Sequence, residues 1–191
     1  MSESVDTLND TLLVARAQSG DLDAFEELVR RYQRGILRYC RGMLGNGPDA
    51  EDAVQDVLVT AWRRLPTLRA AEAVSTWLYR IASHRCIDII RKRRPDGGDP
   101  AEREAEQTAS ESGRHPDTGP EGAVETRLAL SELRHHVAAL PVPQREAWTL
   151  REIHGLSYQD IADISGEPLP TVRGRIARAR AALAERMDSW K

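Results

Sequence analysis

The stretch SYQDIADISGEPLPTVRGRIARARAAL, from Ser157 to Leu183, contains two short helical patterns separated by a single glycine. Ser157 can cap the first helix, because Asp160 follows three residues later and can return a hydrogen bond to the capping residue. Gly166 can take the left-handed conformation that ends this helix in a tight turn. Two short helices joined in this way predict a helix-turn-helix.

The second helix of this pair is predicted to begin near Pro168 and Pro170, because the first turn of a helix does not need their missing N–H groups. Leu169 should resist helical geometry, since a proline follows it. One buried stripe is predicted from the spacing of Val172, Ile176, Ala179 and Leu183. Small residues and arginines, including Arg173 and Arg178, occupy the other side. That face suits the DNA major groove, although a solvated arginine face on an ordinary surface helix is the alternative.

Basic charge is concentrated in two segments, although the whole chain has a net charge of −3. Residues 84–94 contain five basic residues and one acid, and residues 171–187 have the same counts. Residues 95–123 contain eight acids and two bases, are rich in Pro, Gly, Ser and Glu, and show no apolar period. This composition is typical of a solvated linker.

The fold class predicted from these patterns is all-α, with two small helical domains joined by a flexible acidic linker. Aromatic residues make up only 5% of the chain, while the helix formers Ala, Leu, Arg and Glu are plentiful. We place the domains at 1–94 and 123–191, with the linker at 95–122. Cys40 and Cys86 fall on helical apolar stripes, which favours buried thiols over a disulfide.

Several functional classes lack their sequence signatures here. The N-terminus is acidic and has no apolar run long enough for a signal peptide or membrane span, which predicts a cytoplasmic protein. Nucleotide-binding loops, zinc-spaced Cys/His clusters and nucleophile–base pairs are also missing, so we expect no enzyme, cofactor or metal. His135 and His136 are adjacent and would point about 100° apart on a helix, so they cannot readily chelate one ion.

Three further helices are predicted before the linker. The first runs through Phe25 and Cys40, and Pro48 opens the second with acids in its first turn, where they complement the helix dipole. An acidic row on the second helix lies opposite a stripe predicted to be buried, which includes Trp62. The third helix, within 74–94, has a basic end that could receive unstacked bases and phosphates. For Trp77, on this helix, we favour core packing. After the linker, two supporting helices precede the helix-turn-helix, and their predicted apolar surface extends to Ile153.

LPVPQREAWTLREIHGLSYQDIADISGEPLPTVRGRIARARAAL resembles region 4 of bacterial extracytoplasmic-function (ECF) sigma factors, the subunits that direct RNA polymerase to promoters. DAEDAVQDVLVTAWRRL resembles region 2.2, and VSTWLYRIASHRCIDIIRKRR resembles regions 2.3 and 2.4. The resemblance implies three partners. The first is the RNA polymerase core, which would be bound through its β′ clamp helices and β flap. The others are promoter DNA and an anti-sigma factor held between regions 2 and 4.

The same resemblance implies a role for three sets of residues. By this resemblance, the residues that bind core polymerase are Asp49, Asp52, Gln55 and Asp56. Recognition of the −10 element falls to Tyr79, His84, Asp88, Arg91 and Arg93. Recognition of the −35 element falls to Pro170, Thr171, Arg173, Gly174, Arg175 and Arg178. His84 stands where the family commonly has asparagine, and Pro170 and Gly174 stand where it more often has glycine and serine. These departures bear on the promoter sequence recognised.

Two other classes of protein remain open at this point. An ordinary helix-turn-helix regulator would not need the acidic row, so charge reversal at Asp52 and Asp56 would leave its action intact. A sigma mimic that only titrates an anti-sigma factor tends to lose the basic DNA surfaces, which are present here at 91–94 and 173–180. The low overall charge predicts weak DNA binding by the isolated chain.

Overall fold

The computed structural model describes residues 2–45, 47–93 and 132–188, and this part of the chain contains helices and no strands, which confirms the all-α prediction. The first half contains α1 (Ser2–Gln18), α2 (Leu22–Leu44), α3 (Pro48–Arg64), the short 3₁₀ turns η1 (Leu65–Thr67) and η2 (Ala71–Ala73), and α4 (Val74–Arg93). The second half contains a helical stretch at 132–138, α6 (Val142–Trp148), the π-helical turn η3 (Thr149–Ile153), α7 (Tyr158–Ser165) and α8 (Leu169–Asp188). The predicted linker and the predicted start of the second domain lie outside the described residues.

The N-terminal module consists of α1 to α4, and its helices begin and end where local chemistry favours it. Asp21 caps α2 by accepting a hydrogen bond of 3.1 Å from the backbone N–H of Ala24. Gly45 follows α2 with φ of 90°, a conformation that glycine adopts without strain. Pro48 begins α3, as predicted. The helix α1 was not predicted, and its Gln18 amide donates to two backbone carbonyls of the segment that follows α3.

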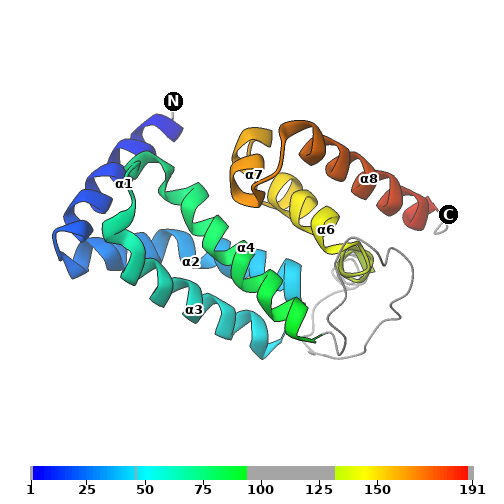
Figure 1. Cartoon of the computed structure of the whole chain (residues 1–191), viewed down its shortest axis with the longest axis horizontal. Helices are drawn as coiled ribbons and strands as arrows, with labels where there is room; N and C mark the ends of the chain where they lie inside the picture. Colours follow the sequence, from blue (N-terminus) through cyan, green and yellow to red (C-terminus); the bar gives the residue numbers. More distant parts are fainter. Residues whose placement is uncertain (1, 46, 94–131, 189–191) are drawn as a thin grey trace, which may run out of the picture.

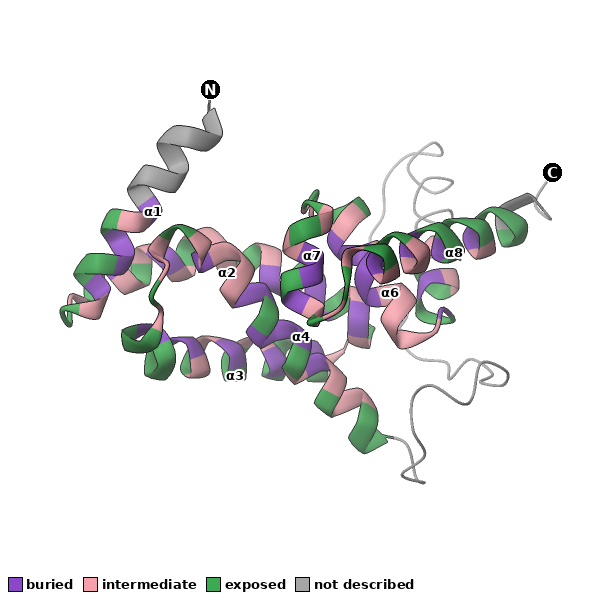
Figure 2. Ribbon diagram, turned by 45° about the horizontal axis from the view of Figure 1, so that its top comes forward, coloured by how far each residue is buried: buried purple, intermediate pink, exposed green. Residues whose placement is uncertain are grey.

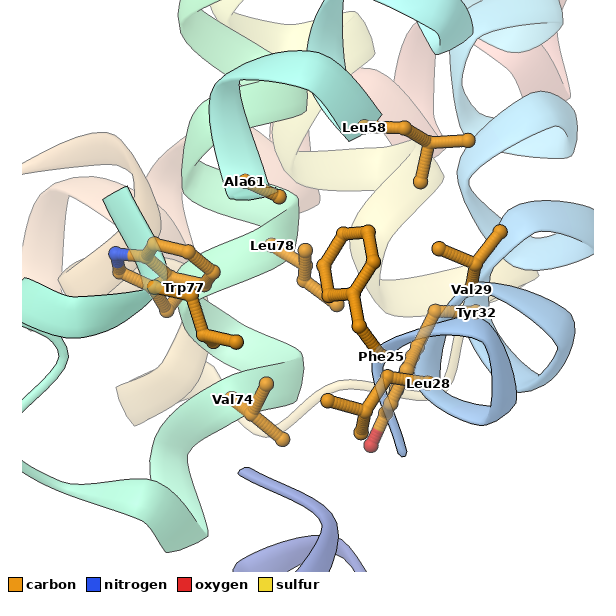
Figure 3. A pocket seen from close by; sticks show the side chains of 10 residues that line it. Phe25, Leu28, Val29, Tyr32, Leu58, Ala61, Val74, Trp77 and Leu78 are labelled. Carbon is orange, nitrogen blue, oxygen red and sulfur yellow. The ribbon is translucent and has the colours of Figure 1, made fainter. Parts of the chain in front are cut away.

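The core of this module lies between α2, α3 and α4 (Figure 2). Cys40 and Cys86 are both buried there as free thiols, as predicted. Trp77 lines a small apolar hollow with Phe25 and other side chains (Figure 3), which confirms core packing for this residue. The predicted burial of Trp62 is wrong, because 38% of it is exposed. Phe25 packs against the Trp62 ring in a tilted arrangement, with ring centroids 4.8 Å apart.

The C-terminal module, from α6 to α8, follows the predicted pattern with two exceptions. The stripe predicted for α8 is buried: Val172, Ile176, Ala179 and Leu183. Leu169, expected to resist helical geometry, is instead the first residue of α8, since the Pro168 carbonyl already accepts a hydrogen bond of 3.1 Å from the N–H of Val172. Leu169 also packs against the core, which offsets the steric cost of the following proline. Ile153, expected to continue the apolar surface, is 40% exposed.

The two modules pack against each other. Figure 1 shows α6, α7 and α8 together on one side of the N-terminal module. Helix α7 contacts α4, while α6 and η3 contact α2. Buried side chains of both modules join in one apolar cluster across this contact. The composition of the chain predicted two domains, but nothing in the sequence patterns predicted that these domains would touch.

Candidate nucleic-acid interface

The helix-turn-helix is stabilised at the start of α7 and at the turn between α7 and α8. The Ser157 hydroxyl accepts from the Asp160 N–H at 3.0 Å, and the Asp160 carboxylate accepts from the Ser157 N–H at 3.2 Å, which completes the predicted capping box. Gly166 ends α7 with φ of 69°, in the left-handed region, as predicted. Glu167, in the turn, pairs with Arg175 of α8 at 2.8 Å. The capping box thus fixes the start of α7, and the Glu167–Arg175 pair ties the turn to α8.

The outer face of α8 presents most of the residues predicted to recognise the −35 element. Pro170, Arg173 and Arg178 are exposed, while Thr171 and Gly174 are half-buried. The Arg178 guanidinium lies close over Gly174, where an added Cβ would stand 3.4 Å from Nη1. Small residues flanked by arginines leave this face able to approach a phosphate backbone closely.

Arg175 is placed differently from the other predicted −35 residues. Its side chain is only 17% exposed and forms the ion pair with Glu167. Arg173, by comparison, lies over the Tyr158 ring, with its guanidinium carbon 5.8 Å from the ring centroid. The structure therefore gives Arg175 a role in holding the turn, whereas Arg173 and Arg178 extend to solvent.

The acidic row of α3 is exposed along its whole length: Asp49, Asp52, Gln55 and Asp56. Two of its members are paired with α4, Asp49 with Arg93 and Asp56 with Arg85. Asp52 and Gln55 have no hydrogen-bond or ion-pair partner among the described residues. The predicted core-binding row is thus tied at both ends to the helix predicted to read the −10 element.

The residues predicted to read the −10 element divide into two groups on α4. His84, Asp88, Arg91 and Arg93 are exposed. Tyr79 is buried, and its hydroxyl shares a hydrogen bond of 2.9 Å with Nδ1 of His154 in the C-terminal module. Burial raises the pKa of the Tyr79 hydroxyl and lowers the pKa of His154 to about 4. Tyr79 is therefore covered by the other module in this arrangement.

Sequence reasoning missed a buried polar cluster between the modules. Ser83 of α4 donates a hydrogen bond to the Glu146 carboxyl of α6, and both residues are almost completely buried. Burial raises the pKa of Glu146, while the Ser83 hydrogen bond and Arg175 partly oppose that rise. Glu146 stands in a helix of mixed polarity, so its sequence neighbours carry no signal of burial. Two glycines inside α2, Gly35 and Gly42, stand where a helix former would be expected, and they lie close to Tyr79 and Thr149, so they signal the close contact of α2 rather than the burial of Glu146.

Two negative findings apply to residues 2–45, 47–93 and 132–188. Every helix there is too short or too polar to span a bilayer. No group of three or more His, Cys, Asp or Glu side chains is placed to bind a metal ion.

Comparisons with known proteins agree with the geometry of both modules. Residues 28–95 match Sigma-70 region 2, and residues 130–183 match Sigma-70, region 4. The RNA polymerase sigma-H factor of Pseudomonas aeruginosa is 37% identical over 176 residues, which cover 91% of each chain. The ECF RNA polymerase sigma-E factor of Escherichia coli is 37% identical over 183 residues, which cover 95% of each chain.

Two solved structures share the fold. CnrH, in complex with the cytosolic domain of CnrY, matches with a TM-score of 0.72 and 28% identity, covering 95% of this chain and 98% of CnrH. The sigma factor RpoE of Bartonella quintana, in complex with the anti-sigma factor NepR, matches with a TM-score of 0.66 and 25% identity, covering 84% and 94%. The chain therefore belongs to the sigma-70 family, as an extracytoplasmic-function sigma factor that contains regions 2 and 4.

Proposed function

We propose that this chain binds the RNA polymerase core through α3 and selects promoters through α4 and α8. In this proposal, residues 1–94 hold the core and read the −10 element, residues 123–191 read the −35 element, and 95–122 join them. The observation that carries the proposal is the presence of region 2 and region 4 in one chain, each with an exposed polar face of the appropriate charge. The chain would supply specificity in the cytoplasm, where the polymerase transcribes, and the polymerase would supply the chemistry.

Recognition at the −35 element would use the outer face of α8. A helix enters the major groove with arginines placed to contact phosphates and guanine edges, and a bidentate arginine–guanine contact contributes about 1–3 kcal/mol of discrimination. Arg173 and Arg178 are the arginines best placed for this role, because both extend from the face that carries Gly174. His84, Asp88 and Arg91 would meet the −10 element from the exposed side of α4.

Control by an anti-sigma factor is part of the proposal. The similar RpoE was solved with its anti-sigma factor NepR, which supports a partner of the same class for this chain. Such a partner would have to cover the α3 row or the faces of α4 and α8 to prevent transcription.

Purified protein is expected to bind promoter DNA weakly by itself and strongly when core polymerase is added. The overall charge of −3 gives little attraction to a polyanion, whereas the polymerase supplies additional DNA contacts. Gel shifts and run-off transcription, with and without core, measure this. Strong, specific binding by the isolated chain would favour an ordinary helix-turn-helix regulator, and no transcription with core would favour a sigma mimic.

Arg178→Ala and Arg175→Ala are expected to have different effects. Arg178→Ala should weaken −35 binding about tenfold, ~1.4 kcal/mol, and change stability by less than about 0.5 kcal/mol. Arg175→Ala should lower the free energy of unfolding by about 1 kcal/mol, because it removes the partly buried partner of Glu167. Urea titrations followed by circular dichroism, combined with holoenzyme gel shifts, separate the two. Equal stability losses in both variants would contradict the assignment of Arg175 to the turn and of Arg178 to the DNA surface.

A further inference from the structure

One ionisable side chain lies deep in the contact between the two modules. Glu146 of α6 is 4% exposed, and its carboxyl accepts a hydrogen bond from the hydroxyl of Ser83 of α4, which is 1% exposed. Helix α6 also contacts α2, where the Tyr39 ring is buried and within reach of the charge of Glu146. The carboxyl therefore faces the N-terminal module, and separation of the modules would open that side of it to water.

No described residue neutralises this carboxyl through an ion pair. Arg145, the preceding residue, donates instead to backbone carbonyls at 2.7 and 3.1 Å. The charge of Arg175 does reach Glu146, but its guanidinium is already paired with Glu167 at 2.8 Å, and the Glu167 carboxylate repels Glu146. A buried carboxylate without a cation is costly, whereas a neutral carboxyl with a hydrogen bond is not.

Two further titratable groups near Glu146 are uncharged. Burial raises the pKa of the Tyr39 hydroxyl well above its usual value. A hydrogen bond with the Cys40 thiol, together with burial, raises the pKa of Cys86. Both groups interact with the Glu146 carboxyl, and neither can supply the positive charge that a carboxylate would need. Burial therefore has the largest influence on Glu146 and raises its pKa, which favours the neutral form in the docked arrangement.

We propose that Glu146 is protonated while the two modules are docked and loses this proton when they separate, so that their contact is linked to pH. The neutral carboxyl keeps the hydrogen bond from Ser83 without placing a charge in the interface. In the separated modules the carboxyl faces water and ionises as an ordinary glutamate does. The proton passes to solvent, and no other bond is made or broken.

The direction of the pH dependence follows from the raised pKa of the docked carboxyl. Below the ordinary glutamate pKa of 4.5, Glu146 is protonated in both arrangements and its contribution to docking is complete. Between that value and the raised pKa, docking takes up a proton, so the docking constant falls up to about tenfold for each pH unit. Above the raised pKa the contribution is lost. Because linkage is reciprocal, any partner that binds only the separated modules releases this proton and binds more tightly as the pH rises.

A second titratable side chain in the contact, His154, acts in the opposite direction. Its Nδ1 shares a hydrogen bond with the Tyr79 hydroxyl, while Nε2 is buried without a hydrogen-bond partner among the described residues. Burial, together with the charge of Arg38, lowers the pKa of His154 from 6.5 to about 4, so docking releases a proton from this ring below pH 6.5. From pH 4.5 to 6.5 the two groups oppose each other. The effect of Glu146 is therefore measured as a difference between variants.

The pKa of Glu146 in the full chain tests this proposal directly. Carboxyl ¹³C NMR follows the titration, and the Glu146→Gln variant identifies the signal. The midpoint should lie above the ordinary value of 4.5. In Gly42→Trp it should return towards that value, because a Cβ at Gly42 would already stand 3.1 Å from Cγ2 of Thr149, and a whole indole would force η3 away from α2. Gly42 lies in the other module from Glu146 and belongs to none of the proposed binding surfaces.

Arg41→Trp is the matched control, since it adds the same side chain one residue earlier, at an exposed position of α2. Glu146 should titrate in this control as it does in the unmodified chain. A midpoint at the ordinary value in the unmodified chain would show that docking does not protonate Glu146. A raised midpoint that persists in Gly42→Trp would show that the burial of Glu146 does not depend on docking. Either result overturns the proposal.

The shape of the chain as a function of pH provides a second test. Small-angle scattering from about pH 5 to about pH 8 gives the ratio of compact to extended chains, and this range covers the expected loss of the proton. Glu146→Gln keeps the size of the side chain and its ability to accept from Ser83, but it removes the titration. Its ratio should match that of the unmodified chain at the acid end. At the alkaline end it should be severalfold higher, by about tenfold for each pH unit between the two pKa values.

Glu132→Gln makes the same chemical change at an exposed position and should behave as the unmodified chain. Equal ratios in Glu146→Gln and the unmodified chain at every pH would overturn the proposal. These measurements use neither polymerase nor DNA, so their failure would leave the proposed function unaffected.

Discussion

Asp52→Lys combined with Gln55→Lys is expected to weaken binding to core polymerase at least tenfold while leaving the fold intact. Both side chains are exposed on α3, and neither has a hydrogen-bond or ion-pair partner among the described residues. Placing two positive charges at the centre of the acidic row opposes any complementary basic surface, and mismatched charges at an interface cost several kcal/mol. Competition between labelled and unlabelled chains for core polymerase measures the loss.

The choice of these two positions matters, because Asp49 and Asp56 pair with arginines of α4. Substitution there would release Arg93 or Arg85 and alter the −10 surface as well. Glu72→Lys is a matched control, since it reverses an exposed acid that lies outside α3. If this control and the double variant bind core equally well, the α3 row is not the core-binding surface.

Ile176→Asp is expected to unfold the C-terminal module. Ile176 is 1% exposed at the centre of the buried stripe of α8, so the new carboxylate would lie in an apolar site without a partner. Such a change costs several kcal/mol, a large share of the about 5–15 kcal/mol that stabilises a typical domain. Urea denaturation followed by circular dichroism measures the change. Transcription from −35-dependent promoters should disappear, while core binding through α3 should remain.

Ala177→Asp provides the control one residue further along α8. Ala177 is exposed, so its carboxylate stays in water and the free energy of unfolding should change by less than about 0.5 kcal/mol. The new charge faces the proposed DNA surface and should weaken −35 binding by repulsion. If Ala177→Asp destabilised the chain as much as Ile176→Asp, the orientation assigned to α8 would be wrong.

The features that were predictable from the sequence are those that depend on residues close together in the chain. The Ser157–Asp160 capping box, the Gly166 turn and the buried stripe of α8 each involve positions within about three turns of one another, so periodicity and turn chemistry identify them. The resemblance to known motifs identified the family in the same way, through contiguous stretches. It also implied roles for α3, α4 and α8 that remain predictions until they are tested.

The relation between the two halves was decided by the tertiary structure. The burial of Tyr79 depends on His154, 75 residues away, and the burial of Glu146 depends on Ser83, 63 residues away. Arg175 looked equivalent to Arg173 and Arg178 along the sequence, but it pairs with Glu167, which stands in the turn before α8, eight residues away. Local patterns set where each helix forms and which face it buries. Which module covers another depends on the shapes and charges of surfaces that meet only after both modules have folded.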